Sequence, residues 1–331
     1  MTAKDTTTRI EYAGAVQAVA RSVAIGLATL LVVSFVVFFA TQALPGDVAR
    51  QILGANATAE QLANLREQLG LDRPAIVQYL DWLGGIARLD FGTSLAARIP
   101  VGELLATRAA NTVAVVLIAA LVAIPLAFVL GILAARRPGG LADHVISAGA
   151  QLSLSMPEFV IGIALLSVLA ANVLHLVPPA SILDPRYGPL AQPQLLVLPV
   201  LTMVLIAMPH LVESVKTLMR EELGSEHVRW ARLSGIRESR IRSRYALPNV
   251  LAPSLQVSAT TLGYLLGGTV AVETVFSFPG IGSALVSAVA SRDVVVVQAI
   301  TMSVTAILVL AFVVADVIGM LTTPRLRAVN R

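Results

Sequence analysis

Six long apolar segments constrain the fold of this chain more than any other feature of its sequence. A helix needs about 20 apolar residues to cross the hydrocarbon core of a bilayer. The segments span Val23–Ala43, Thr112–Leu133, Val145–Leu174, Leu195–Leu218, Leu251–Val272 and Val294–Leu321. Charged residues make up 13 % of the chain and hydrophobic residues 56 %, whereas an ordinary soluble domain carries about 25 % charged residues. We therefore predict an all-α polytopic membrane protein with six transmembrane helices.

The first and third segments each require a choice between two interpretations. The third is too long for one upright helix, and Pro157 predicts a kink or a split, because proline removes a backbone donor and clashes with the preceding turn. The first resembles a signal peptide, but its apolar run of about 20 residues exceeds the usual 7–15. No clean small-residue cleavage site follows it, so an uncleaved span is the better interpretation.

The placement of arginine and lysine predicts the orientation of the spans, because short cytoplasmic loops carry an excess of both. Six spans put the two ends of the chain on the same side of the membrane. If that side is the cytoplasm, the inner segments hold 16 of the 24 positive residues, and the two short outer connections hold only Arg186 and Arg292. We therefore predict cytoplasmic ends at 1–22 and 323–331, with a transmembrane domain at 23–322 in the cytoplasmic membrane.

The long outer segment, residues 46–110, carries signals for two helices. Thr58 and Gln61 form a capping-box pattern, and Pro74 opens a second helix that Gly84-Gly85 is expected to end. The predicted apolar face of this second helix consists of Ile76, Tyr79, Leu80 and Leu83. We expect a small extracytoplasmic helical cap over the membrane part; the alternative is a surface decoration without a role.

The inner segment between the fourth and fifth spans, residues 225–248, is the most informative stretch. Ser225 is placed to cap a short helix with Glu226 in its first turn, where an acidic side chain suits the helix dipole. Gly235 can end that helix in the left-handed conformation at little cost. We predict a helix–turn–helix on the cytoplasmic face with a small-residue knob at Ala231, suited to docking on a soluble partner. The alternative is that its arginines only follow the positive-inside rule or contact anionic lipid.

This segment resembles the coupling motif of ABC importer permeases, which is Glu-Ala-Ala, three residues, Gly, nine residues and Ile-x-Leu-Pro. Arg229-Trp230-Ala231 stands at the Glu-Ala-Ala positions, Gly235 at the glycine and Tyr245-Ala246-Leu247-Pro248 at the end. The glycine-to-proline spacing is intact, and variation at the first two positions is usual in the peptide branch of that family. The residues that the resemblance implies for coupling to an ATPase are Glu226, Arg229, Ala231, Gly235, Arg240 and Pro248.

Four further stretches are similar to the dipeptide/oligopeptide/nickel permeases within that family. They are Leu44-Pro45-Gly46-Asp47, Leu69-Gly70-Leu71-Asp72-Arg73-Pro74 with Gln78-Tyr79, Asp90-Phe91-Gly92-Thr93-Ser94, and Val272-Glu273-Thr274-Val275-Phe276-Ser277-Phe278-Pro279-Gly280-Ile281-Gly282. The resemblance covers about residues 20 to 327. One departure lies at the C-terminus, where Thr323-Pro324-Arg325 replaces the usual Asp-Pro-Arg.

The resemblance implies an importer with two permease subunits, two ABC ATPase subunits and an extracytoplasmic solute-binding protein. The second permease is then expected to be a homologue of this chain, and the solute to be peptide-like. Neither lysine of the chain follows a glycine, so the chain lacks a Walker-type phosphate loop. ATP and Mg²⁺ are therefore expected on the partner ATPases, with no cofactor and no catalytic residue in this chain.

Buried polar residues are the candidates for the transport path, because a charge at the centre of a span costs at least about 2.5–3.5 kcal/mol and usually faces a partner or a wet cavity. Glu273 closes the fifth span and leads into the Pro279-Gly280 turn, a candidate re-entrant gate. The predicted pathway or gate residues are Glu158, Glu273, Pro279 and Gly280. Glu213 lies one turn from both His210 and Lys216, so pairing within the helix is the simpler interpretation for these three. Gly263 and Gly267 have the Gly-x-x-x-Gly spacing that permits close helix packing.

Other classes of protein fit the sequence less well. A proton-coupled secondary transporter using Glu158, His210 or Asp316 is the main alternative, but it predicts inverted repeats that are not apparent here. No hydrolase or kinase motif set is present around Asp90-Phe91-Gly92 or elsewhere, and a passive channel would leave the 225–248 segment unexplained. The scattered histidines and the absence of cysteine argue against a metal site. Most of the arginines border apolar runs, and we therefore expect no nucleic-acid partner.

Overall fold

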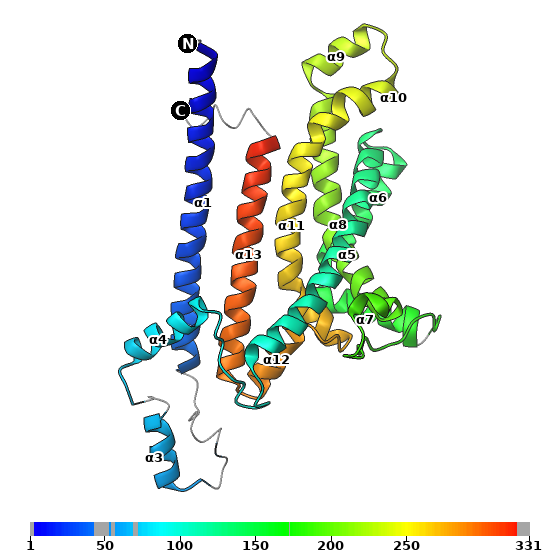
Figure 1. The fold of residues 1–331 in the computed structure, drawn as a ribbon. Helices are drawn as coiled ribbons and strands as arrows, with labels where there is room; N and C mark the ends of the chain where they lie inside the picture. The colour runs from blue at the N-terminus through cyan, green and yellow to red at the C-terminus, as the bar shows by residue number, and fades with distance from the viewer. Residues whose placement is uncertain (1–2, 43–52, 54–56, 69–71, 172, 323–331) are drawn as a thin grey trace. The chain divides into compact units, whose positions relative to one another are not determined.

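The computed structural model describes residues 3–42, 53, 57–68, 72–171 and 173–322. Its described part is helical, and the only β contact among these residues is an isolated bridge between Thr93 and Pro100 (Figure 1). The helices are α1 (Ala3–Gln42), α3 (Ala59–Gln68), α4 (Ala75–Ala87), α5 (Val101–Ala135), α6 (Leu141–Ser155), α7 (Glu158–Leu166), α8 (Pro193–Leu223), α9 (Glu226–Leu233), α10 (Glu238–Arg240), α11 (Leu247–Val275), α12 (Ile281–Ala290) and α13 (Val294–Thr322). Short π and 3₁₀ turns lie at Ser167–Ala171, Pro189–Ala191 and Ile241–Ala246.

Five of these helices are long and apolar enough to cross a membrane, and a bent helix pair makes a sixth span if the pair crosses as one unit. The five spans are Val19–Gln42, Val101–Ala135, Pro193–Leu223, Pro253–Val275 and Val294–Val314. Helices α6 and α7 form the broken span, with a bend of 105° between them. The all-α polytopic prediction is therefore confirmed, and so is the predicted split of the third segment at Pro157.

The chain divides into two compact units. The larger comprises Met1–Gly26, Val113–Phe278 and Leu308–Arg331, and the smaller comprises Leu27–Thr112 and Pro279–Ile307. The core of the larger unit is formed where α8 packs against α6, α7 and α11. Its fully buried side chains include Met203, Leu265 and Phe276. Gly131 of α5 permits close approach to α8, because a β-carbon at this position would lie 2.8 Å from Val215.

The smaller unit has its own core at the contact of α5, α12 and α13, around Val101, Ile281 and Ile300. Beside this core, the Asp-Phe-Gly-Thr-Ser stretch is fixed by a buried carboxylate. Ser94 Oγ donates a 2.5 Å hydrogen bond to Asp293 Oδ2, and the backbone N–H of Ala96 donates to the same atom at 3.1 Å. These contacts join the segment before α5 to the first turn of α13.

The outer helices partly match their predictions. Thr58 and Gln61 form the expected reciprocal capping box, with N–O distances of 2.9 and 3.3 Å. Helix α4 begins after Pro74 as predicted, but the predicted stop at Gly84-Gly85 is wrong, because the helix continues to Ala87. A glycine in a helix costs only about 1 kcal/mol, and the chain turns instead at Leu89, which has a φ of +63°.

The predicted apolar face of α4 also needs correction. Tyr79 is buried, but Ile76 and Leu80 are exposed. Tyr79 packs edge-on against Phe38 of α1 at 5.5 Å, and Trp82 lies 5.4 Å from the same ring. The face of α4 that packs against α1 is therefore the aromatic one, with Tyr79 and Trp82, and not the predicted aliphatic one. The Leu44–Asp47 stretch, Leu69–Leu71 and the C-terminal Thr323–Arg325 lie outside the described residues.

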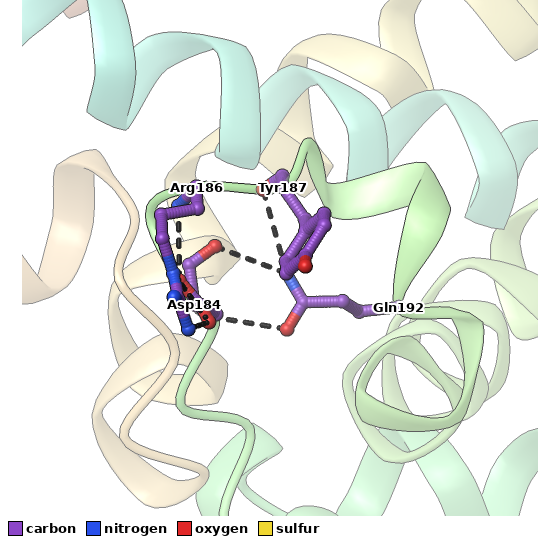
Figure 2. Close-up of polar contacts among 4 residues, drawn as sticks. All are labelled: Asp184, Arg186, Tyr187 and Gln192. Atoms are coloured by element: carbon purple, nitrogen blue, oxygen red, sulfur yellow. Dashed lines mark hydrogen bonds and ion pairs between the residues drawn. The ribbon is translucent and has the colours of Figure 1, made fainter.

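The loop before α8 is closed by polar contacts within the larger unit. Gln192 donates through its side-chain amide to the carbonyl oxygens of Asp184 and Tyr187, and Arg186 Nη2 lies 2.6 Å from Asp184 Oδ2 (Figure 2). The Arg186 side chain holds the pKa of the Asp184 carboxyl below its ordinary value by donating hydrogen bonds to it. This connection is thus an ordered turn.

Candidate functional site

The 225–248 segment folds as a closed helical hairpin between the end of α8 and the start of α11 (Figure 1). Ser225 is the N-cap residue of α9, but its side chain makes no capping hydrogen bond to α9, so the predicted cap is wrong. Its hydroxyl donates instead to the carbonyl of Glu222 at 2.6 Å. Glu226 lies in the first turn of α9, as expected, and is exposed.

Gly235 ends α9 in the left-handed conformation, with a φ of +75°. The N–H of Gly235 donates to the carbonyl of Arg232, and the N–H of Ile236 donates to the carbonyl of Ala231. These two bonds form a Schellman motif, which requires a positive φ at the glycine position. Ile236 also packs against the small cluster of Val228, Ala231 and Ile241. A hydrophobic contact of this kind, from the residue after the glycine, frequently accompanies a Schellman motif.

The prediction of an exposed knob at Ala231 is wrong. Ala231 is 6 % exposed, because α9 packs its Val228 and Ala231 face onto Ile241. The side chains that do project are Trp230, 69 % exposed, and Leu233, 72 % exposed. They lie three residues apart and therefore share one side of α9. The apolar contact surface of the hairpin is thus formed by these two larger residues.

Two acidic residues that the sequence analysis did not single out hold the hairpin together. Glu222 of α8 accepts a 2.6 Å hydrogen bond from Asn249 Nδ2 and lies 3.0 Å from His227 Nε2. Glu238 of α10 pairs with Arg232 Nε at 2.6 Å. The remaining coupling candidates (Arg229, Arg240 and Pro248) are exposed, and Pro248 lies in the first turn of α11.

An ion network lies in the helices that precede the hairpin. Asp143 of α6 pairs with Arg220 Nη2 of α8 at 2.6 Å and with Lys216 Nζ at 3.9 Å. Lys216 Nζ also contacts Glu213 at 2.6 Å and donates to Ser147 Oγ at 2.7 Å. The predicted Glu213–Lys216 pair is therefore present. Asp143, which the sequence analysis did not identify, makes the network extend across two helices.

Three of the predicted gate residues, Glu273, Pro279 and Gly280, are anchored by hydrogen bonds to neighbouring residues. Glu273 is 3 % exposed in the last turns of α11, and its backbone carbonyl accepts a hydrogen bond from the N–H of Phe278. In the smaller unit, Asn111 Nδ2 donates to the carbonyl of Pro279 at 2.8 Å, and the N–H of Gly280 donates to Ser283 Oγ. These contacts anchor the turn before α12 to α5.

The predicted helix-packing glycines differ in their surroundings. A β-carbon at Gly263 would lie 3.4 Å from the Phe312 ring of α13, so this glycine permits close packing within the chain. Within the described chain, no atom comes within 4 Å of a β-carbon placed at Gly267. Its neighbour Gly268 lies against Glu158.

Five apolar helices long enough to span a membrane, a bent helix pair and a charged helical hairpin make this chain a polytopic membrane protein. Among the described residues, no group of three or more His, Asp or Glu side chains is arranged to hold a metal ion.

The comparisons with known proteins identify the family. Residues 127–328 match the model of the binding-protein-dependent transport system inner membrane component, and residues 16–116 match the N-terminal model of the same transport system. The chain therefore belongs to the binding-protein-dependent transport system inner membrane components, which are permease subunits of ABC importers. It is a multi-pass membrane protein and not itself an enzyme.

Two relatives illustrate the similarity. The glutathione transport system permease protein GsiC of Salmonella choleraesuis is 31 % identical over 299 residues, which are 90 % of this chain and 95 % of that protein. The oligopeptide transport system permease protein AppB of Bacillus subtilis is 29 % identical over 300 residues, again 90 % and 95 % of the two chains.

Proposed function

We propose that this permease subunit imports peptides or related small solutes, and that its 225–248 hairpin docks on an ABC ATPase in the cytoplasm. The observation that carries the docking proposal is the exposure of Trp230 and Leu233 on a hairpin that is otherwise internally bonded. Aromatic side chains that are exposed in the free protein and become buried in the complex frequently anchor protein interfaces. The peptide substrate is supported by the names of the oligopeptide and glutathione permeases that the chain resembles.

In this scheme the energy comes from partner subunits. Two ATPases bind ATP and Mg²⁺, and their closure moves the hairpins of two permease subunits, this chain and a homologue. An extracytoplasmic binding protein delivers the solute to the outward-facing cavity. The hairpin is suited to transmit force because His227 and Arg232 tie α9 to the end of α8, and Glu222 in turn ties α8 to Asn249 at the start of α11.

The docking proposal is tested by co-purification of the chain with an ATPase expressed beside it. Replacing Trp230 and Leu233 together by serine removes the exposed apolar surface without disturbing the buried cluster. Truncating a hot-spot anchor costs about 2 kcal/mol or more, so we expect the affinity for the ATPase to fall by about thirtyfold or more. Leu190→Ser is the matched control, because Leu190 is 69 % exposed and lies outside the hairpin.

The outcome separates docking from a general loss of fold. Ala231→Glu is unsuitable as the only variant, because it places a charge in the buried cluster and should disrupt the hairpin itself. Equal recovery of the ATPase with the serine double variant and with wild type would contradict the docking proposal. Uptake by the chain alone under a proton gradient, without any ATPase, would instead support the secondary transporter.

The proposed orientation has a direct test, because the natural chain contains no cysteine. A single cysteine at Ser234, which is exposed in the hairpin, should react with a membrane-impermeant thiol reagent only from the cytoplasmic side. A single cysteine at the exposed Tyr187 should react only from the outer side. The reverse pattern would show that both ends of the chain are extracytoplasmic.

A further inference from the structure

Three polar side chains from three different helices meet within the membrane-spanning part of the larger unit. Glu158 lies at the break of the α6–α7 span, and His210 and Tyr264 lie near the middles of α8 and α11. The three helices pack against one another.

Direct contacts define the geometry of this group. Tyr264 Oη donates a hydrogen bond to Glu158 Oε1 at 3.2 Å, and the His210 and Tyr264 rings lie 5.4 Å apart in an edge-on arrangement. Gly268, one turn after Tyr264, provides the space for the carboxylate. A β-carbon at Gly268 would come within 3.0 Å of both carboxylate oxygens of Glu158.

The carboxylate of Glu158 lacks a charged partner in the part of the chain that the structure describes. None of the ion pairs among those residues includes Glu158, and Tyr264 is the one side chain that donates a hydrogen bond to it there. A carboxylate within a span faces a partner or a water-filled cavity, because exposure to lipid is costly. Tyr264 is 50 % exposed and His210 is also exposed, so the group is open on one side.

We propose that Glu158 and Tyr264 form a transient binding site for a protonated primary amine of the transported solute, such as the amino terminus of a peptide. The carboxylate supplies the opposite charge, and the Tyr264 ring supplies an aromatic face that attracts a cation. The His210 ring packs against Tyr264 and limits the positions that the tyrosine ring can take. The proposal rests on the proposed import of peptides and specifies the part of the solute that this chain contacts.

The test measures binding of a simple peptide to the assembled importer in lipid nanodiscs, without its binding protein. The probes are radiolabelled trialanine and N-acetyl-trialanine, which differ in the charge of the amino terminus. We expect wild type to bind trialanine about tenfold more tightly, a factor equivalent to about 1.4 kcal/mol. Glu158→Gln should remove this preference, and Tyr264→Leu should reduce it. Glu103→Gln, which removes an exposed charge elsewhere on the chain, should leave it unchanged.

Two further variants keep the test independent of folding defects. Glu158→Asp keeps the charge and should keep part of the preference, whereas Gly268→Ala keeps the charge but displaces the carboxylate and should reduce it. Equal binding of the two probes by wild type, no measurable binding of trialanine, or an intact preference in Glu158→Gln would overturn the proposal.

ATP-dependent uptake of trialanine by the same complex with its binding protein distinguishes this inference from the proposed function. Uptake without any preference for the free amine would refute only the amine site. Absence of ATP-dependent peptide uptake would refute the proposed function itself.

Discussion

Replacing Asp293 by alanine should destabilise the smaller unit substantially. Asp293 is 2 % exposed and accepts hydrogen bonds from Ser94 Oγ, from the N–H of Ala96 and from the N–H of Val296. The last of these bonds is the N-cap interaction of α13, since α13 begins at Val294. The substitution therefore removes a helix cap and leaves two further donors without their acceptor.

The magnitude follows from these contacts. Loss of an aspartate N-cap costs about 0.5–2 kcal/mol, and each buried donor left unsatisfied costs about 1–3 kcal/mol. Water can reach part of the space left by the carboxylate, so we expect a total of about 3 kcal/mol. Ser94→Ala alone should cost about 1 kcal/mol, because Asp293 keeps its other two donors.

The double variant provides the decisive comparison. In Asp293→Ala the Ser94 hydroxyl still accepts from the N–H of Ala97 but has lost the acceptor of its own proton. Removing the hydroxyl should therefore cost less in Asp293→Ala than in the wild type, so the two costs should not add. Unfolding by sodium dodecyl sulfate in mixed micelles can be followed through Trp82, which contacts Phe38 in the same unit, with Trp230 replaced by phenylalanine. Strict additivity of the two substitutions would refute the reasoning, and so would a loss below about 1 kcal/mol for Asp293→Ala.

Three further predictions concern packing, buried polar contacts and pH. Gly131→Ala should cost about 1–3 kcal/mol through overpacking, measured by the same unfolding titration, whereas Gly149→Ala, with no atom within 4 Å, should be neutral or stabilising. Gln298 Nε2 of α13 donates a buried 2.7 Å hydrogen bond to Thr41 Oγ1 of α1, and Gln298→Leu should cost only about 0.6 kcal/mol in that titration, the average for a hydrogen bond between membrane helices. The low pKa of Asp184 means that its contact with Arg186 stabilises the turn before α8 above the ordinary aspartate pKa and is lost as pH falls through the lower folded value. The hydrogen-exchange protection factors of this turn, corrected for the pH dependence of intrinsic exchange, should fall over that interval, and Arg186→Gln should shift the change to higher pH.

The spans and their breaks could be predicted from the sequence because they depend on local chemistry. Apolar length identifies a membrane helix, and Pro157 breaks α6 from α7 irrespective of the rest of the fold. The capping box at Thr58 and the positive φ of Gly235 are likewise decided by residues within a few positions. Such features need no knowledge of which helices become neighbours.

The contacts between distant segments could not be predicted in this way. Asp143, Glu222 and Asp293 carry polar contacts in the structure, yet each is an ordinary acidic residue near a helix end in the sequence. Ala231 matched the position of a knob, but its burial depends on Ile241 folding back over α9. Covariation among homologues is the signal that would have revealed these pairs.

The packing of Gly268 against Glu158 has a consequence for sequence divergence. While residue 158 is glutamate, every residue other than glycine at 268 brings a β-carbon within 3.0 Å of the carboxylate. We therefore expect the two positions, which are 110 residues apart in the chain, to vary together among relatives. Relatives with a short side chain at the first position should be free to vary the second, and those with glutamate at the first should keep glycine at the second.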